Sequence, residues 1–159
     1  MKLRDLITED VILPDMAARD KRSAIHELVE FLRERKGFTE DQARKIEAAI
    51  LRRESKGTTG IGKGVAIPHV KNCAHVESIV AALGISRTGI PFASLDGEPV
   101  NLVFLVASSK QCEREHLDIM RKIAYLARDE KTNRFLATTR DFSSLEDILA
   151  EVDEYFDNR

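Results

Sequence analysis

A histidine at the end of a glycine-rich segment gives this chain residues that could handle phosphate. Residues 57–64 hold four glycines, and a short apolar run leads from them into Pro68 and His69. The imidazole pKa is about 6.5, so at neutral pH one ring nitrogen carries a lone pair that can attack phosphorus, provided that the other nitrogen is held as N–H. Phosphoryl transfer otherwise needs mainly positioning and positive charge, which Arg52 or Arg53 could supply. We therefore expect His69 to act as a phosphate carrier.

The same glycines approach the pattern of a nucleotide-binding P-loop. Gly57 to Lys63 reads G-x-x-x-x-G-K, but Gly64 stands where Ser or Thr would hold magnesium. A P-loop must also follow a strand and open a helix, so that the helix N-terminus faces the phosphates. Here a predicted helix precedes the glycines and a predicted strand follows them. This context argues against ATP or GTP binding, and we expect no cofactor.

Apolar spacing and turn signals predict the elements that position the histidine. Residues 6–13 indicate a first strand or an extended arm, which Pro14 cuts off. Apolar residues then recur at helical spacing, and they predict a helix that is capped by Asp20 or Ser23 and ends at Gly37. Helical structure therefore follows the opening segment closely.

A second helix and three strands complete the predicted middle of the chain. Thr39 is a natural N-cap for a helix that ends near Arg53. Residues 65–67 read as the end of a strand, residues 78–85 as a longer strand followed by a turn at residues 87–89, and residues 100–107 as a central strand buried on both faces. The sheet should thus lie after two helices.

The last third of the chain is predicted to be helical. Residues 117–127 form one amphipathic stripe, which we assign to the core, residues 133–137 a short helix, and residues 145–156 a closing helix with Ser143 or Ser144 as its cap. Helices before and after the strands predict an α/β fold with three α/β/α layers, in which helices flank a mixed central sheet. We expect a single domain that spans residues 1–159.

Composition excludes several function classes. The 159 residues are 43% hydrophobic and 33% charged, with a net charge of −2 and charges of both signs interspersed, which argues against nucleic-acid binding. No apolar run approaches the roughly 20 residues of a membrane-spanning helix, and no signal peptide opens the chain, so we expect a cytoplasmic protein without membrane insertion.

The cysteines do not indicate a metal site. Cys73 and Cys112 suit a reducing compartment, where such a pair would stay as thiols. Together with His75 and His116 they offer two sulfurs and two imidazoles, but neither spacing is usual for zinc ligands. We therefore expect no metal.

The residues around His69 resemble a known active-site signature. Arg53-Glu54, then Thr59-Gly60-Ile61-Gly62, then the run from Gly64 to His69 are similar to the signature of the type-2 IIA (EIIA) domains of the bacterial phosphotransferase system (PTS), the fructose/mannitol and nitrogen-regulatory group. The resemblance extends over nearly all of the chain, including the stretch around His116. It implies a phosphotransferase in which His69 accepts phosphate from the phosphohistidine of the carrier protein HPr and passes it to a cysteine or histidine of a IIB partner.

The resemblance also assigns supporting residues. His116 would hydrogen-bond the phosphoryl group, and Arg53 would give cationic support. The expected phosphate cradle consists of Thr59, Gly60, Gly62, Lys63 and Gly64. Two residues depart from the pattern: Lys63 stands where family members often have a small polar residue such as Asn, and Val70 where many have Gly.

The role of the phosphate is open at this point. The sequence slightly favours the nitrogen-regulatory branch, whose members bind other proteins in a phosphorylation-dependent way. One alternative is a sugar-transport IIA component for fructose- or mannitol-type uptake. Another is a regulatory binding module that keeps the fold but is never phosphorylated.

Overall fold

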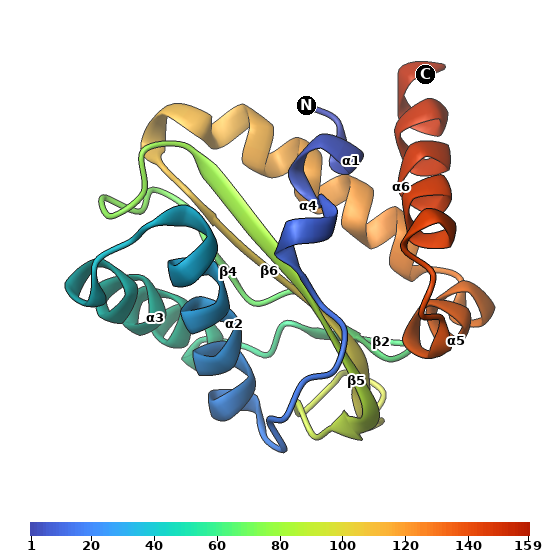
Figure 1. Cartoon of the computed structure of the whole chain (residues 1–159), viewed down its shortest axis with the longest axis horizontal. Coiled ribbons are helices and arrows are strands. Elements are labelled where there is room, and N and C mark those ends of the chain that lie inside the picture. Colours follow the sequence, from blue (N-terminus) through green and yellow to red (C-terminus); the bar gives the residue numbers. More distant parts are fainter.

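The computed structural model describes all 159 residues as six α-helices, six strands and two short 3₁₀ segments (Figure 1). In chain order these are α1 (Leu3–Leu6), η1 (Glu9–Val11), β1 (Ile12–Leu13), α2 (Lys21–Lys36), α3 (Glu40–Ser55), β2 (Gly60–Gly62), β3 (Val65–Ala66), β4 (His69–Val70), β5 (Ile79–Ile90), β6 (Val100–Ser108), η2 (Lys110–Cys112), α4 (Glu113–Ala127), α5 (Glu130–Thr138) and α6 (Phe142–Asp157).

The six strands form one mixed sheet, as expected. The order is β1-β5-β6-β3-β2. Strand β4 also pairs with β6, at a position nearer the C-terminal end of β6 than β3 does. The long strands β5 and β6 are antiparallel, whereas β3 and β4 run parallel to β6 and β1 runs parallel to β5. Strands β3 and β4 are therefore two parts of one line, interrupted at Ile67 and Pro68.

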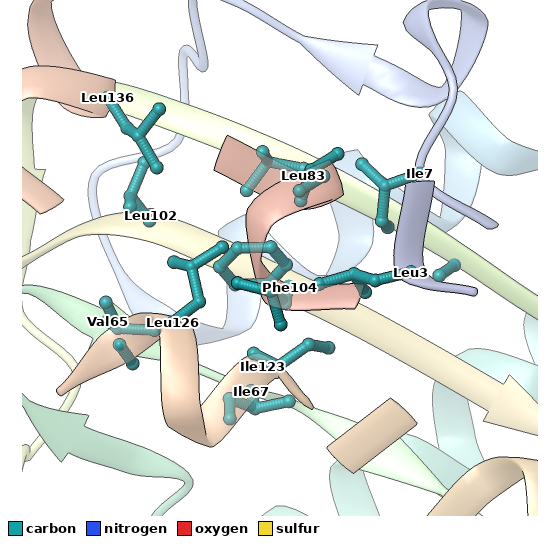
Figure 2. Packing of buried hydrophobic residues seen from close by; sticks show 14 of the residues in the cluster. Leu3, Ile7, Val65, Ile67, Leu83, Leu102, Phe104, Ile123, Leu126 and Leu136 are labelled. Atoms are coloured by element: carbon teal, nitrogen blue, oxygen red, sulfur yellow. The ribbon is translucent and has the colours of Figure 1, made fainter. Parts of the chain in front are cut away.

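Separate apolar cores cover the two faces of the sheet. One core joins the sheet to α1, α4, α5 and α6, and the other joins it to α2 and α3. In the first core, Phe104 of β6 lies among Leu3, Ile7, Ile123 and Leu126, all of which are buried (Figure 2). The three-layer arrangement predicted from the sequence is thus confirmed.

The first two long helices begin and end where the sequence predicted. Asp20 accepts a hydrogen bond from the backbone N–H of Ser23 at the start of α2, and Gly37 ends that helix with a left-handed φ of 74°. Thr39 and Gln42 form a reciprocal capping box at the start of α3. These local side-chain bonds satisfy backbone donors that a helix leaves free.

Other expectations need correction. Residues 6–13 are only partly extended, because α1 and η1 precede the two-residue strand β1. Strand β5 continues through residues 87–89, where we expected a turn, and it accommodates Gly89 at a φ of 87° in an irregular part of its pairing. The closing helix is capped by Asp141 rather than by a serine, and Leu117 is 53% exposed rather than part of the core. No helix has the length and apolar character needed to span a membrane.

Candidate functional site

His69 lies at the first position of β4, where the chain rejoins the sheet after Pro68. It stands opposite Val106 of β6, and the carbonyl of Pro68 accepts a hydrogen bond from the Val106 N–H. The Nδ1 atom of His69 is 2.6 Å from the carbonyl oxygen of Ile67. A carbonyl can only accept, so Nδ1 must carry the proton and donate it. In the neutral ring, the lone pair is then on Nε2.

The surroundings of His69 favour the neutral ring. Burial is the largest influence and lowers its pKa below 6.5, and the positive charge of Arg53 also lowers it. The hydrogen bond to the Ile67 carbonyl and the charge of Glu54 act in the opposite direction but are outweighed. At neutral pH the Nε2 lone pair is therefore available without a general base.

His116 lies beside His69 on the first turn of α4. The ring centroids are 5.6 Å apart and the ring planes are tilted by 49°. His116 is only 6% exposed, and its Nδ1 atom is 2.7 Å from the hydroxyl of Ser108 at the end of β6. Burial, reinforced by repulsion from His69 and Lys71, lowers the pKa of His116 to about 4. Both rings are thus neutral at pH 7.

Arg53 lies on the last turn of α3 and faces the same space. Its guanidinium donates to the carbonyl of Gly57 at 2.9 Å. A cavity of about 780 Å³ is lined by all three residues, Arg53, His69 and His116. The structure therefore brings together two histidines and an arginine that are distant in the sequence.

Thr59 supports the site without lining the cavity. It is buried, and its carbonyl accepts a hydrogen bond from the N–H of Ile67, the residue whose own carbonyl holds His69. The carboxylate of Glu54 accepts hydrogen bonds from both the backbone N–H and the hydroxyl of Thr59, and Lys21 of α2 reaches the same carboxylate at 3.0 Å. A continuous series of contacts thus runs from α2 to the ring of His69.

We did not assign a role to Glu54 from the sequence. A signal was present, because a carboxylate near a helix C-terminus is unfavourable unless another group holds it. Its partners come from α2 and from the loop after α3, so its contacts could not be seen from local pattern alone.

Lys63 and the glycines do not form a cradle around His69. Lys63 occupies the turn between β2 and β3 with a left-handed φ of 57°, and its ammonium donates to the carbonyl of Arg128 at 2.7 Å. Val65 pairs with Leu102, whereas His69 pairs with a residue four positions further along β6, about 13 Å away along a strand. None of the expected cradle residues, Thr59, Gly60, Gly62, Lys63 and Gly64, lines the cavity.

The glycines instead allow close packing and turns. A Cβ on Gly60 would lie 2.5 Å from the hydroxyl of Ser94, so this position has no room for a side chain. Gly62 and Gly64 both have left-handed φ values, of 97° and 80°. Strands follow these residues where a P-loop would begin a helix, which contradicts the nucleotide-binding alternative.

Apart from Arg52, the alternative to Arg53 as a source of positive charge, the other residues at the cavity were not predicted as site residues. Cations at its edge are Arg52, Lys56 and Lys71, and Leu117 and Met120 of α4 add apolar surface. Val70, where we noted a departure from the family pattern, lines the cavity with an ordinary negative φ, so this position does not need glycine.

The two cysteines are free thiols. Cys73 is buried, whereas Cys112 is half-buried. No three His, Cys, Asp or Glu side chains lie close enough together to hold a metal ion.

The chain is similar to several known proteins. Residues 5–152 match the family described as "Phosphoenolpyruvate-dependent sugar phosphotransferase system, EIIA 2". The nitrogen regulatory protein of Bradyrhizobium diazoefficiens is 35% identical over 94% of this chain and 95% of its own. The fructose-specific EIIABC component of Bacillus subtilis is 32% identical over 97% of this chain, which spans only 24% of that protein. The crystal structure of the nitrogen regulatory protein IIA-Ntr from Neisseria meningitidis superimposes with a TM-score of 0.81, at 26% identity and over 92% of this chain and 98% of that one. The chain belongs to the EIIA type 2 family of the phosphoenolpyruvate-dependent sugar phosphotransferase system.

Proposed function

We propose that His69 carries a phosphoryl group on its Nε2 atom. The observation that carries this proposal is the 2.6 Å contact between Nδ1 of His69 and the carbonyl of Ile67, which leaves Nε2 as the only nucleophilic atom of the ring. Burial keeps the ring unprotonated at neutral pH, so this atom is ready to react.

The step balances without a metal or a base. The Nε2 lone pair attacks the phosphorus of a phosphohistidine on an HPr-like donor, and the phosphorus–nitrogen bond of the donor breaks. The donor ring, protonated on its other nitrogen, leaves as neutral imidazole. His69 becomes a phosphoimidazolium whose Nδ1–H still donates to the Ile67 carbonyl, so no proton needs to move.

His116 and Arg53 stabilise the group that is transferred. When the Ser108 hydroxyl donates to Nδ1 of His116, the proton of that neutral ring is on Nε2, where it can donate to a phosphoryl oxygen. Arg53 supplies a fixed positive charge at the same cavity, because the Gly57 carbonyl holds its guanidinium. Positioning and charge of this kind are what phosphoryl transfer requires of a protein.

We propose that the phosphate on His69 regulates the binding of protein partners, and transfer to a IIB-type acceptor is the second candidate. The nitrogen regulatory relative matches over nearly its whole length, which supports the first. The fructose-specific relative supports the second, since this chain matches one part of a longer transport component.

Chemical phosphorylation tests the proposal. Phosphoramidate, which phosphorylates histidine without a protein donor, should label the wild type at Nε2 of His69, as ³¹P and ¹H–¹⁵N NMR can establish. The variant His69→Gln should lose this signal. His75→Gln, at the same cavity, is the matched control and should keep it. An unlabelled wild type, as expected of a binding module that is never phosphorylated, or a labelled His69→Gln would overturn the proposal.

A further inference from the structure

Cations surround the cavity at His69, and no carboxylate lines it. Its fully charged lining residues are Arg52, Arg53, Lys56 and Lys71. The chain as a whole has a net charge of −2, and each of the four other main cavities is lined by at least two acidic residues. The positive potential is therefore a local property of this opening.

The four cations are not equivalent. The guanidinium of Arg53 is held by the Gly57 carbonyl. Arg52, Lys56 and Lys71 are exposed, and none of the three takes part in an ion pair within the chain. We call these three residues the basic rim. Their charges are free to meet charges on another molecule.

The opening is larger than a phosphoryl group requires. Its volume of about 780 Å³ is typical of a site for a drug-sized ligand. Leu117, next to His116 in the sequence, is 53% exposed, and together with Met120 it adds apolar surface beside the two histidines. Charged groups around an apolar centre are the usual composition of a protein interface. Direct transfer also requires the two reacting atoms to approach within about 3.5 Å, which brings the partner's surface onto the rim.

We propose that the protein surface that docks at His69 is acidic, with carboxylates around its own phosphoryl-carrying residue that pair with the basic rim. This inference rests on the proposed function, because it identifies the partner of the same site. Phosphorylation of His69 brings a phosphoryl group of about −2 and leaves the ring with a charge of about +1, so the net change of about −1 offsets roughly a quarter of the charge of the four cations. The acidic partner therefore binds the unphosphorylated protein more tightly and is released more readily once transfer is complete.

Peptide binding tests the surface independently of phosphorylation. The probe is a peptide with a central histidine and three glutamates on each side, and its matched control has lysines in place of the glutamates. In ¹H–¹⁵N NMR titrations at low salt, the acidic peptide should shift the amide signals of Arg52, Lys56 and Lys71 and bind at least tenfold more tightly than the lysine peptide. The difference should disappear near 0.5 M salt. Equal binding of the two peptides, or acidic-peptide shifts located elsewhere, would refute the inference.

Transfer from the same peptides, phosphorylated on histidine, tests the rim in the reaction. Neutralising the rim with Arg52→Gln and Lys56→Gln should slow transfer from the acidic peptide about tenfold. The control pair Arg22→Gln and Lys131→Gln removes two exposed cations that do not line the cavity and should leave the rate unchanged. The wild type and the control pair should react equally with phosphoramidate. A rim variant as fast as the wild type with the acidic peptide contradicts the inference, whereas failure of phosphoramidate to label the wild type contradicts the proposed function alone.

Discussion

The two neighbouring histidines have the same side chain but different partners at Nδ1. His69 faces a carbonyl, which can only accept, whereas His116 faces the hydroxyl of Ser108, which can also donate. The carbonyl leaves the lone pair of neutral His69 on Nε2, and the hydroxyl permits His116 to be a donor at Nε2. One pair of identical rings can thus supply both the attacking atom and a hydrogen bond to the group that it attacks.

The lowered pKa of His116 makes the free energy of unfolding depend on pH. The unfolded chain binds a proton at His116 below about pH 6.5, while the folded chain does so only near pH 4, so stability is complete above 6.5 and is lost as the pH falls towards 4. We expect His116 alone to account for a loss of about 2 kcal/mol by pH 4.5 in urea denaturation. In His116→Gln this part of the pH dependence should vanish, whereas His75→Gln should retain it. An unchanged pH dependence in His116→Gln would show that the pKa is not lowered.

Among the elements, α3 is joined to the site by a buried carboxylate. Glu54 accepts from Lys21, from the Thr59 N–H and from the Thr59 hydroxyl, and Thr59 in turn binds Ile67. In Glu54→Gln an amide group would face these donors with one acceptor oxygen in place of two. We expect a loss of about 3 kcal/mol in urea denaturation, and slower labelling of His69 by phosphoramidate in the remaining folded protein.

The control for this substitution is Glu47→Gln on the same helix, whose carboxylate pairs with the exposed His26. Because that contact is near the surface, the change should cost less than about 1 kcal/mol and leave labelling unaffected. A Glu54→Gln protein as stable and as reactive as this control would mean that the buried network does not position His69.

The sequence predicts an element well when its stabilising contacts are local. Helices α2 and α3 were predicted because Asp20, Gly37 and Thr39 form caps within a few residues. The sequence did not predict the course of β5 beyond residue 85, because that part of β5 is positioned by pairing with another strand, β6. Lys63 was misplaced for the same reason: its contact with Arg128 joins residues 65 positions apart.

Site residues follow the same rule. The signature around His69 predicted the reacting residue, and the resemblance supplied His116 and Arg53 as candidates. The structure places these three at one cavity, although their catalytic roles stay predictions. The series of hydrogen bonds from Glu54 through Thr59 to Ile67 forms only in the folded protein, and no spacing in the sequence indicates it.

For the molecule as a whole, a buried ion pair ties the first residues to two helices. Lys122 of α4 and Asp153 of α6 are 3.1 Å apart and both are almost fully buried. Asp153 also accepts from the N–H groups of Leu3 and Arg4, and the Lys122 ammonium donates to the carbonyl of Met1. The first backbone N–H groups of α1, which have no acceptor within the helix, therefore donate to the carboxylate of Asp153.

Removing one member of this pair should destabilise the protein strongly. We expect Asp153→Ala to cost about 3–5 kcal/mol in chemical denaturation, because it leaves a buried ammonium and two backbone donors without their partner. The exposed Glu151→Ala in the same helix should cost less than about 1 kcal/mol. The double variant Lys122→Met with Asp153→Ala should recover part of the loss, and full additivity of the two changes would contradict a direct pairing.

The cavity at His69 draws residues from both faces of the sheet. Arg53 belongs to α3, which packs on one core, and His116 belongs to α4, which packs on the other. In related proteins the side chains of either core can diverge separately, since the sheet divides them. A replacement that moves α3 relative to α4 nevertheless changes the distance between a cation and a histidine. The cavity therefore limits how far the side chains of the two cores can diverge in evolution, because α3 and α4 must keep their relative position.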